Sequence, residues 1–378
     1  MMKKAIYAFS ADPIHYGHID IIRRSANVFD ELVVGIGVNA NKQTLFSLEE
    51  RMDMVRKSLE KIKNVSVVAF PGLLVDYAYE NSIPVIVKGV RTALDFDYEK
   101  LQHQCGESQK LGIDTFIMFA RPELNHISST SVKAMQKEQG LVHEFVPLYV
   151  KQWLEAKMLG QYIVGITGEP SSGKSYIGRK FEELGKERGI SVHNIELDDI
   201  GHQILGELKE SVYEEIRENI AKTFGNSVRL PDGAIDRKIL GELVFNDTEQ
   251  LKKLNEIMYT PILVRLRRGL YGKRGLILLN AALIAESEMA YLCNNNVVFL
   301  NVDKATQNKR LRSKDLTAEQ IKRRLASQHT FDQKRNKLQE KINEENQGKI
   351  WVINNSDNSD AKEINQVFES IINELNVK

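Results

Sequence analysis

The sequence predicts an α/β protein made of two parallel-sheet domains. Apolar runs of strand length alternate with longer amphipathic runs typical of helices, and this alternation begins again near residue 161. The 378 residues also exceed what one hydrophobic core usually serves, while 42% apolar and 27% charged residues are typical of a globular chain. We therefore expect one domain over residues 1–160 and a second over residues 161–378.

The first domain is predicted to contain five buried strands separated by crossover helices. Ser47 and Glu50 form a capping box that starts one helix, and residues 147–159 are predicted to form the last helix of the domain. Such a parallel sheet binds ligands at the carboxyl ends of its strands. The strands are predicted at residues 4–9, 32–38, 65–70, 84–89 and 115–120.

Composition excludes several classes of protein. The chain has 52 Lys and Arg residues against 51 Asp and Glu residues, so it lacks the basic excess of a general nucleic-acid or membrane-surface binder. Cys105 and Cys293 form no paired motif, which disfavours a disulfide framework and fits a reducing cytoplasm. The first residues make a poor signal peptide, and the longest uncharged apolar stretch, residues 275–285, is too short to span a bilayer. We expect a cytoplasmic protein with no nucleic-acid or membrane partner.

Two histidines follow the first predicted strand. Pro13 and Gly17 interrupt the strand pattern, and an amphipathic helix opens at about His18. A helix N-terminus offers unpaired N–H groups to a phosphate, and His15 and His18 could donate hydrogen bonds there. The alternative is a turn whose two imidazoles are satisfied by backbone carbonyls.

Further polar side chains follow later strands of the first domain. Lys42 is expected just past the second strand, and Lys88 and Arg91 just past the apolar run PVIV of the fourth strand. Hydroxyls after the fifth strand open another helix and so offer a second anion site. Each lysine alone would more often be a solvated surface charge, but together these groups indicate a phosphate-binding edge. The hydroxyl residues are Ser128, Ser129 and Thr130.

The second domain is predicted to begin with a phosphate-binding loop. The loop fits G-x-x-x-x-G-K-[ST] and lies between a strand at residues 162–167 and a helix. Its N–H groups cradle phosphates, Lys174 reaches the β- and γ-oxygens, and Ser175 coordinates Mg²⁺. This pattern predicts a site for a nucleoside triphosphate. The motif comprises Gly168, Glu169, Pro170, Ser171, Ser172, Gly173, Lys174 and Ser175.

Carboxylates and a basic segment complete this second site. Glu196, Asp198 and Asp199 end the next predicted strand, where a carboxylate could accept a hydroxyl proton or organise Mg²⁺. Asp198 or Asp199 could instead be a helix N-cap. Residues 309–341, which follow a strand at 297–302, carry 11 basic against 4 acidic residues, as a lid over phosphates requires. A solvated helix pair is the alternative.

The motifs HYGH, NKQTLFSLEERM, VKGVRTALDFDYE and HISSTSVK resemble those of the bacterial phosphopantetheine adenylyltransferase family over nearly all of residues 3–158. This family of HxGH nucleotidyltransferases implies a Rossmann-like fold, ATP and 4′-phosphopantetheine as substrates, and dephospho-CoA and pyrophosphate as products. The family commonly forms hexamers, which implies a possible homo-oligomer.

The resemblance implies a role for each matching residue. His18 would stabilise charge at the α-phosphate, and Lys42 would bridge the incoming phosphate and ATP. Arg91 and the hydroxyls at 128–130 would hold the β- and γ-phosphates. The sequence departs from the family at Ser10, where Thr is usual, at Ala11, and at Lys88, where Arg is usual, and the change to Lys removes a bidentate fork. The pantetheine arm would be lined by Ser10, Leu73, Leu74 and Lys88, and the adenine side by Tyr98 and Glu99.

The second domain resembles dephospho-CoA kinase over most of residues 162–375. The likeness is carried by GEPSSGKS, ELDDIGH, DGAIDRKILGELVF, EIMYTPI, LLNAALIAE, RLRSKDLTAEQIKRRLASQ and VINNSDNSD. It implies transfer of the γ-phosphoryl group of ATP to the ribose 3′-hydroxyl of dephospho-CoA. Lys174 would neutralise phosphate charge, Ser175 and Asp198 would lie at the metal, and Asp198 would be the base. Arg310 and Arg324 are candidate lid cations.

The two resemblances together imply a bifunctional coenzyme A synthase, because the first product is the second substrate. One alternative is another transferase, cytidylyl or nicotinamide-mononucleotide adenylyl, joined to an unrelated small-molecule kinase. A second alternative is an active transferase with a degenerate, regulatory nucleotide-binding domain. The second alternative is supported by Glu196 and Asn280, which stand where the kinase family often has Asp, and by Tyr259 and Thr260 before Pro261, where it usually has His.

Overall fold

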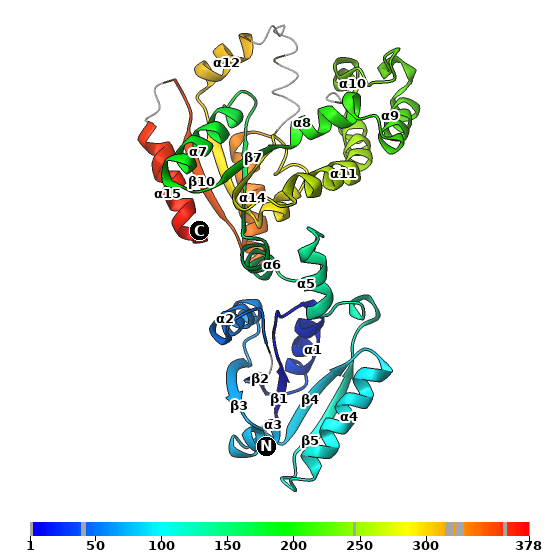
Figure 1. Cartoon of the computed structure of the whole chain (residues 1–378), viewed down its shortest axis with the longest axis vertical. Helices are drawn as coiled ribbons and strands as arrows, with labels where there is room; N and C mark the ends of the chain where they lie inside the picture. Colours follow the sequence, from blue (N-terminus) through cyan, green and yellow to red (C-terminus); the bar gives the residue numbers. More distant parts are fainter. Residues whose placement is uncertain are drawn as a thin grey trace. The chain divides into compact units, whose positions relative to one another are not determined.

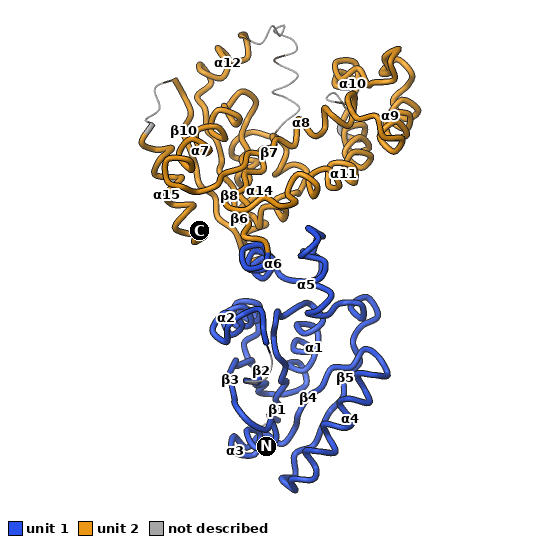
Figure 2. Tube along the Cα trace, viewed as in Figure 1, with its two compact units in different colours: residues 1–158 blue, residues 159–378 orange. Residues whose placement is uncertain are grey.

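The computed structural model describes residues 3–38, 43–244, 247–313, 321, 329–357 and 361–377. The chain divides into two compact units, residues 1–158 and 159–378 (Figure 2). Each unit contains one five-stranded sheet whose strands are all parallel (Figure 1). The predicted α/β class with two parallel sheets is therefore confirmed.

The first sheet has the strand order β3-β2-β1-β4-β5. The order reverses between β1 and β4, so the carboxyl ends of these two strands border the crevice where such sheets bind ligands. The apolar run of β2 is buried on both faces, with Leu32, Val34 and Ile36 fully covered, as expected for a strand between helical layers. The strands are β1 (Lys4–Phe9), β2 (Glu31–Val38), β3 (Val65–Pro71), β4 (Val85–Val90) and β5 (Asp114–Phe119).

The helices of the first unit begin where the sequence supplies caps. Ser47 accepts a hydrogen bond from the N–H of Glu50 at the start of α2, and the Glu50 side chain completes the predicted capping box. The last predicted helix is split into α6 and a π-helical turn, η2. The elements are α1 (Tyr16–Ala26), α2 (Leu48–Leu59), α3 (Leu74–Glu80), α4 (Ala93–Glu107), α5 (Ser129–Lys137), α6 (Leu148–Leu154) and η2 (Glu155–Leu159).

The second sheet has the strand order β10-β9-β6-β8-β7. One core cluster packs its strands against α7 and α15, with Phe181 and Phe368 in edge contact at a centroid distance of 5.3 Å. The segment between β7 and β8 is helical and contains α8, α9, α10 and α11 (Figure 1). The strands are β6 (Gln161–Gly168), β7 (Val192–Glu196), β8 (Gly275–Asn280), β9 (Asn296–Asn301) and β10 (Lys349–Asn354).

The remaining helices connect or flank these strands. Within the described residues, no helix combines the length and the apolar character that crossing a membrane requires. The helices are α7 (Lys174–Arg188), α8 (Leu197–His202), α9 (Ser211–Phe224), α10 (Arg237–Val244), α11 (Thr248–Leu270), α12 (Lys304–Arg312), α14 (Phe331–Glu345) and α15 (Ala361–Leu375).

Candidate active sites

The two histidines of the first unit lie stacked at the start of α1. His15 is the N-cap residue and His18 lies in the first turn, with ring centroids 3.6 Å apart. The ring of Phe9, at the end of β1, lies 4.3 Å from the His18 ring. A Cβ on Gly17 would lie only 3.0 Å from the His15 ring, so glycine lets that ring fold back against the helix. The structure thus places both imidazoles at the carboxyl end of the central strand.

Both imidazoles are neutral at neutral pH. Burial lowers the pKa of His15 to about 3, with a further contribution from the nearby Arg91 cation. Burial, His15 and Arg91 hold the pKa of His18 well below its usual value of 6.5. The backbone N–H of His15 donates to Nδ1 of His18 over 3.4 Å, so the proton of the neutral ring lies on Nε2. His18 is therefore prepared to donate a hydrogen bond and is poorly suited to act as a base.

A cavity of about 350 Å³ gathers most of the residues expected at the ATP site. It joins the ends of β1 and β4 to the start of α5 and to one face of α4, across the reversal of strand order. The structure therefore brings together residues that lie up to about 120 positions apart in the sequence. Among the lining residues are Ser10, His15, His18, Arg91, Tyr98, Glu99, Ser128, Ser129 and Thr130.

Arg91 and the hydroxyl turn are held in place by contacts of their own. Arg91 pairs with Asp95 over 3.0 Å and donates to the carbonyl of Ile127 over 2.8 Å. Ser128 caps α5 by accepting the N–H of Ser131 over 3.0 Å, as the sequence predicted. Ser129 donates to the carbonyl of Pro13 over 2.8 Å and so ties this turn to the loop that carries His15. Arg91 and the turn at residues 128–130 are thus held in fixed positions at the cavity.

A second cavity, of about 300 Å³, is lined by three of the four residues that the sequence resemblance places at the pantetheine arm. Leu73, Leu74 and Lys88 line it, whereas Ser10 lines only the first cavity. Lys88 lies inside β4, directly after the apolar run at residues 85–87. Its ammonium pairs with Glu99 over 2.7 Å, and Glu99 borders both cavities. Lys42 lies outside the described residues.

Two buried residues that the sequence analysis missed shape the loops of the first cavity. Asp12 accepts the N–H groups of Leu45 and Phe46 at 3.1 and 3.0 Å and pairs with Lys133 at 2.7 Å. Burial alone would raise the pKa of the Asp12 carboxyl, but these partners lower it. Arg51, which is 6% exposed, donates to the carbonyl of Ser10 over 2.7 Å. The sequence signal that could have identified Arg51 is its position as a charged residue within the apolar stripe of α2.

The phosphate-binding loop of the second unit lies between β6 and α7. Gly173 caps α7 with a φ of +91°, and a Cβ there would lie 2.1 Å from Nδ2 of Asn355. That amide donates to the carbonyl of Ser172 over 2.7 Å, so the end of β10 supports the loop from one side. Glycine is required because the backbone is left-handed and closely approached.

A cavity of about 420 Å³ joins this loop to the residues expected around the phosphates. Ser175 donates to Glu196 over 3.1 Å. Glu196 is the N-cap residue of α8, so the N-cap interpretation of Asp198 or Asp199 is wrong; both lie in the first turn. Gly168, Glu169 and Ser172 do not line the cavity, and Arg324 lies outside the described residues. The lining includes Pro170, Ser171, Gly173, Lys174, Ser175, Glu196, Asp198, Asn280 and Arg310.

Three residues that line this second site have a buried donor without a partner among the described residues, and one of the three donors is Oγ of Ser171. Asn280 is 3% exposed, and its Nδ2 is buried without a hydrogen bond. Nη1 of Arg310 is also buried and unbonded, and it lies 3.6 Å from where a Cβ on Gly173 would be. Another cavity of the second unit, of about 490 Å³, is also lined by Arg310 and extends to Asn355 and Asp357. Unpaired buried donors beside a phosphate loop are suited to anionic ligands.

Comparisons with known proteins agree with this division of sites. A cytidylyltransferase-like family model matches residues 7–135, and a dephospho-CoA kinase model matches residues 162–350. A phosphopantetheine adenylyltransferase from Clostridium botulinum (strain Eklund 17B / Type B) is 40% identical over 146 residues, which cover 39% of this chain and 92% of the relative. The Aquifex aeolicus (strain VF5) phosphopantetheine adenylyltransferase is 43% identical over 157 residues, covering 42% and 97% of the two chains.

A solved dephospho-CoA kinase from Campylobacter jejuni matches 57% of this chain and 97% of its own, with 24% identity and a TM-score of 0.35. Fold, cavities and family matches define the class as a nucleotidyltransferase joined to a P-loop kinase. More specifically, the chain belongs to the phosphopantetheine adenylyltransferase family in its N-terminal part and to the dephospho-CoA kinase family in its C-terminal part. Both predicted resemblances are confirmed. Neither the alternative pair of enzymes nor a degenerate, regulatory second domain is better supported than these two families.

Proposed function

We propose that this chain carries out the last two steps of coenzyme A biosynthesis. The first unit joins ATP to 4′-phosphopantetheine, releasing pyrophosphate, and the second phosphorylates the 3′-hydroxyl of the resulting dephospho-CoA. The observation that carries this proposal is the presence of both families in one chain, because they act on consecutive intermediates. We assign the adenylyl transfer to residues 1–160 and the phosphorylation to residues 161–378.

In the first step, a phosphate oxygen of phosphopantetheine attacks the α-phosphorus of ATP, and the bond to pyrophosphate breaks. The nucleophile is already anionic near neutral pH, so it needs no protein base. We assign Nε2 of His18 to the developing charge, and Arg91 with the turn formed by Ser128, Ser129 and Thr130 to the β- and γ-phosphates. The neutral charge of His18 and the fixed position of Arg91 support these roles.

The binding of the substrate arms is assigned from the two adjoining cavities. Leu73, Leu74 and Lys88 border the second cavity, which we assign to the pantetheine arm. Tyr98 and Glu99 border the first, on the adenine side, and Ser10 lies at its β1 end. We assign Lys42, as the sequence resemblance implies, to bridge the incoming phosphate of phosphopantetheine and ATP.

In the second step, the ribose 3′-oxygen attacks the γ-phosphorus of ATP and ADP leaves. We assign Asp198 as the acceptor of the hydroxyl proton, and Lys174 with Arg310 to the phosphate charge. Both cations and the carboxylate border one cavity. The carboxylate of Asp198, which lines that cavity, has the proton-accepting oxygen that this step needs.

Mg²⁺ is the metal that the donor set of the kinase cavity fits best. One hydroxyl, from Ser175, and the carboxylates of Glu196 and Asp198 are hard oxygen donors, and Mg²⁺ typically keeps waters and substrate phosphates in its other positions. No group of three or more His, Cys, Asp and Glu side chains suited to a metal occurs in the described part of the chain, which argues against a site made wholly from such ligands. When bound, the metal would neutralise phosphate charge.

We also propose that the protein associates with copies of itself through α4 and β5. Leu94 is 81% exposed and Phe119 is 71% exposed, and four neighbours in these elements are also exposed apolar residues. Such patches are typical of protein interfaces. Light scattering of the purified chain should give a mass above 43.1 kDa, and a monomer would contradict this part of the proposal. The four neighbours are Phe96, Tyr98, Leu101 and Phe116.

The proposed function is tested with the purified full chain, phosphopantetheine, ATP and MgCl₂. We expect dephospho-CoA to form first and coenzyme A afterwards, as followed by chromatography. His18→Ala should lower the first rate by about 10²–10³-fold, because it removes a donor to the transition state. With dephospho-CoA supplied directly, the same variant should form coenzyme A at the wild-type rate.

Lys174→Ala is the complementary variant. It should abolish coenzyme A formation while dephospho-CoA accumulates at the wild-type rate, because only the P-loop site loses its cation. Unchanged coenzyme A formation in Lys174→Ala would contradict the assigned kinase site. Failure of the wild-type chain to form either product would contradict the proposed function as a whole.

A further inference from the structure

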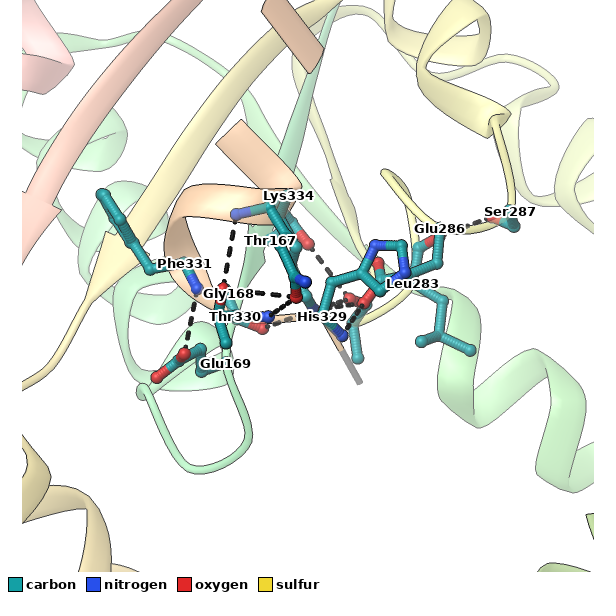
Figure 3. A network of polar contacts seen from close by, with 12 residues as sticks. Thr167, Gly168, Glu169, Leu283, Glu286, Ser287, His329, Thr330, Phe331 and Lys334 are labelled. Carbon is teal, nitrogen blue, oxygen red and sulfur yellow. Dashed lines mark hydrogen bonds and ion pairs between the residues drawn. The ribbon is translucent and has the colours of Figure 1, made fainter. Parts of the chain in front are cut away.

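Glu169 occupies a position that the P-loop motif leaves unrestricted, and its carboxylate turns away from the phosphate cavity. Oε1 accepts the backbone N–H of Phe331 over 3.0 Å, and Oε2 accepts Nε2 of Gln307 over 3.2 Å. Phe331 begins α14 and Gln307 lies in α12. One carboxylate of the phosphate loop therefore binds two helices that lie more than 130 positions further along the chain. Figure 3 shows the contact with α14.

The contact with α12 fixes the face of that helix that carries Arg310. Residues three positions apart lie on one face of a helix, so Gln307 and Arg310 point the same way. Gln307 is 5% exposed and also donates to the carbonyl of Pro170 over 3.0 Å. Arg310 borders both cavities of the second unit, with its buried Nη1 beside Gly173. The position of Arg310 thus depends on how Gln307 is anchored to the loop, together with the ion pair of Nη2 of Arg310 with Asp357 over 3.4 Å.

The contact with α14 is supported by a buried lysine. Lys334 is 0% exposed, and its ammonium pairs with Glu286 over 2.9 Å. It also donates to the carbonyl of Ala282, beyond β8, over 2.8 Å and to that of Gly168 over 3.4 Å (Figure 3). Because Lys334 and Glu169 hold the same end of α14, this helix gives Glu169 a fixed support from which to hold Gln307.

We propose that Glu169 is a positioning residue of the kinase site, which fastens α12 and α14 to the phosphate loop and so holds Arg310 against the phosphates of ATP. This inference rests on the proposed kinase function. Glu169 does not touch the substrates itself, because it does not border the cavity. Loss of its carboxylate would leave Gln307 with only its bond to the carbonyl of Pro170, so Arg310 would be held less firmly on the side of the phosphate loop. On its other side, α12 would keep the ion pairs of Lys309 and Arg310 with Asp357, at 2.7 and 3.4 Å.

The test is a double-mutant cycle with the full chain, dephospho-CoA, ATP and MgCl₂. Glu169→Ala should lower the kinase kcat/KM for ATP by about 10-fold, and Arg310→Ala by about 100-fold, on the scale of lost hydrogen bonds and charged contacts. If Glu169 acts through Arg310, the double variant should be no slower than Arg310→Ala, within about threefold. Glu169→Gln keeps one acceptor oxygen and should fall between wild type and Glu169→Ala.

Multiplicative effects in this cycle, about 1,000-fold in the double variant, would overturn the inference, because a general structural role does not depend on Arg310. The adenylyl transfer rate should remain at the wild-type value in all four proteins and reports that the first unit is folded, and an unchanged denaturant-unfolding transition of the second unit reports that the kinase domain is folded. Glu363→Ala is a matched control, since Glu363 is a half-buried acceptor that receives Nδ2 of Asn354 over 3.0 Å and borders none of the cavities described. It should leave the kinase unchanged.

A wild-type chain that forms dephospho-CoA but no coenzyme A would contradict the proposed kinase function separately. In that case, the positioning role is tested by measuring the ATP dissociation constants of the same four proteins. Each of them then also carries Arg91→Ala, which should weaken ATP binding in the first unit. Non-additive losses of affinity would support the role of Glu169, and additive losses would overturn it.

Discussion

His15 and His18 show how burial at one turn sets the charge of a reactive residue. An imidazolium at His18 would titrate near the working pH of most enzymes, whereas burial keeps both rings neutral. The neutral ring gives a constant donor at Nε2. The consequence is an active-site histidine whose contribution does not vary with pH across the neutral range.

This leads to a prediction about titration. We expect the ring resonances of His15 and His18, among the 8 histidines, to show no midpoint between pH 8 and about 5 in NMR spectra of the histidine-labelled chain. The unfolded chain takes up these protons near pH 6.5, so the free energy of unfolding of the first unit should decrease as pH falls below that value. The ring resonance that is lost in the His18→Gln variant is the resonance of His18. A midpoint near 6.5 for His18 would contradict the assigned donor role.

Asn280 leads to a second prediction. Asn280 and Glu196 are register partners at the ends of neighbouring strands β8 and β7, and both border the kinase cavity. Asn280→Asp would add a hard oxygen ligand with a negative charge, so the Mg²⁺ concentration that gives half the maximal kinase rate should fall by about 3–10-fold. A constant or higher requirement would place the metal away from Asn280. The Mg²⁺ dependence of adenylyl transfer is the internal control.

The sequence could predict residues whose role follows from local pattern. Ser47 and Ser128 are caps recognisable from spacing, and Gly173 with Lys174 belongs to a loop motif with a known backbone shape. Asp12, Arg51 and Asn355 could not be assigned, because their partners lie more than 30 positions away in the sequence. Their function is to hold loops, and it exists only after the sheet has formed.

At the scale of elements, the approach of β10 to the start of α7 is the tightest constraint described around the kinase site. Gly173→Ala should lower kinase kcat/KM by at least about 100-fold and lower the free energy of unfolding of the second unit by about 1–3 kcal/mol. The reason is a left-handed φ combined with a Cβ that would lie 2.1 Å from Asn355. Kinase assays and denaturant unfolding measure the two effects.

Gly189 provides a matched control at the other end of the same helix. It also has a left-handed φ, +69°, but a Cβ there would meet nothing within 4 Å. Gly189→Ala should therefore cost about 1–2 kcal/mol of stability while leaving the kinase rate unchanged. Equal losses of activity in both variants would show that backbone strain, rather than the approach of Asn355, controls the loop.

Each of the five predicted strands of the first unit begins and ends within one residue of the observed strand. The fourth predicted strand, residues 84–89, includes Lys88 beyond the apolar run that ends at Val87, and the strand is observed at Val85–Val90. The charge at Lys88 is tolerated inside the strand because Glu99 from α4 pairs with it. The apolar stretch at residues 275–285 was noted only for its length, and its strand β8 became evident from pairing with β6 and β7.

At the scale of the whole molecule, two compact units with separate cavities predict that the activities are separable. Residues 1–160 expressed alone should form dephospho-CoA, and residues 161–378 should convert it to coenzyme A, each with kcat within about threefold of the full chain. The contact-based division after Met158 lies close to this boundary. Separate assays of the fragments measure both rates. A fragment that is inactive alone, while its reaction persists in the intact protein, would contradict independent units.

The position of β10 has a consequence for synthesis of the protein. The first sheet is complete once residue 119 has emerged from the ribosome, and its unit once residue 158 has emerged. The second sheet receives an edge strand only from residues 349–354, and its phosphate loop is supported by Asn355 immediately afterwards. Because domains fold in order during translation, the adenylyl-transferring half can mature on the ribosome while the phosphorylating half still awaits its final residues.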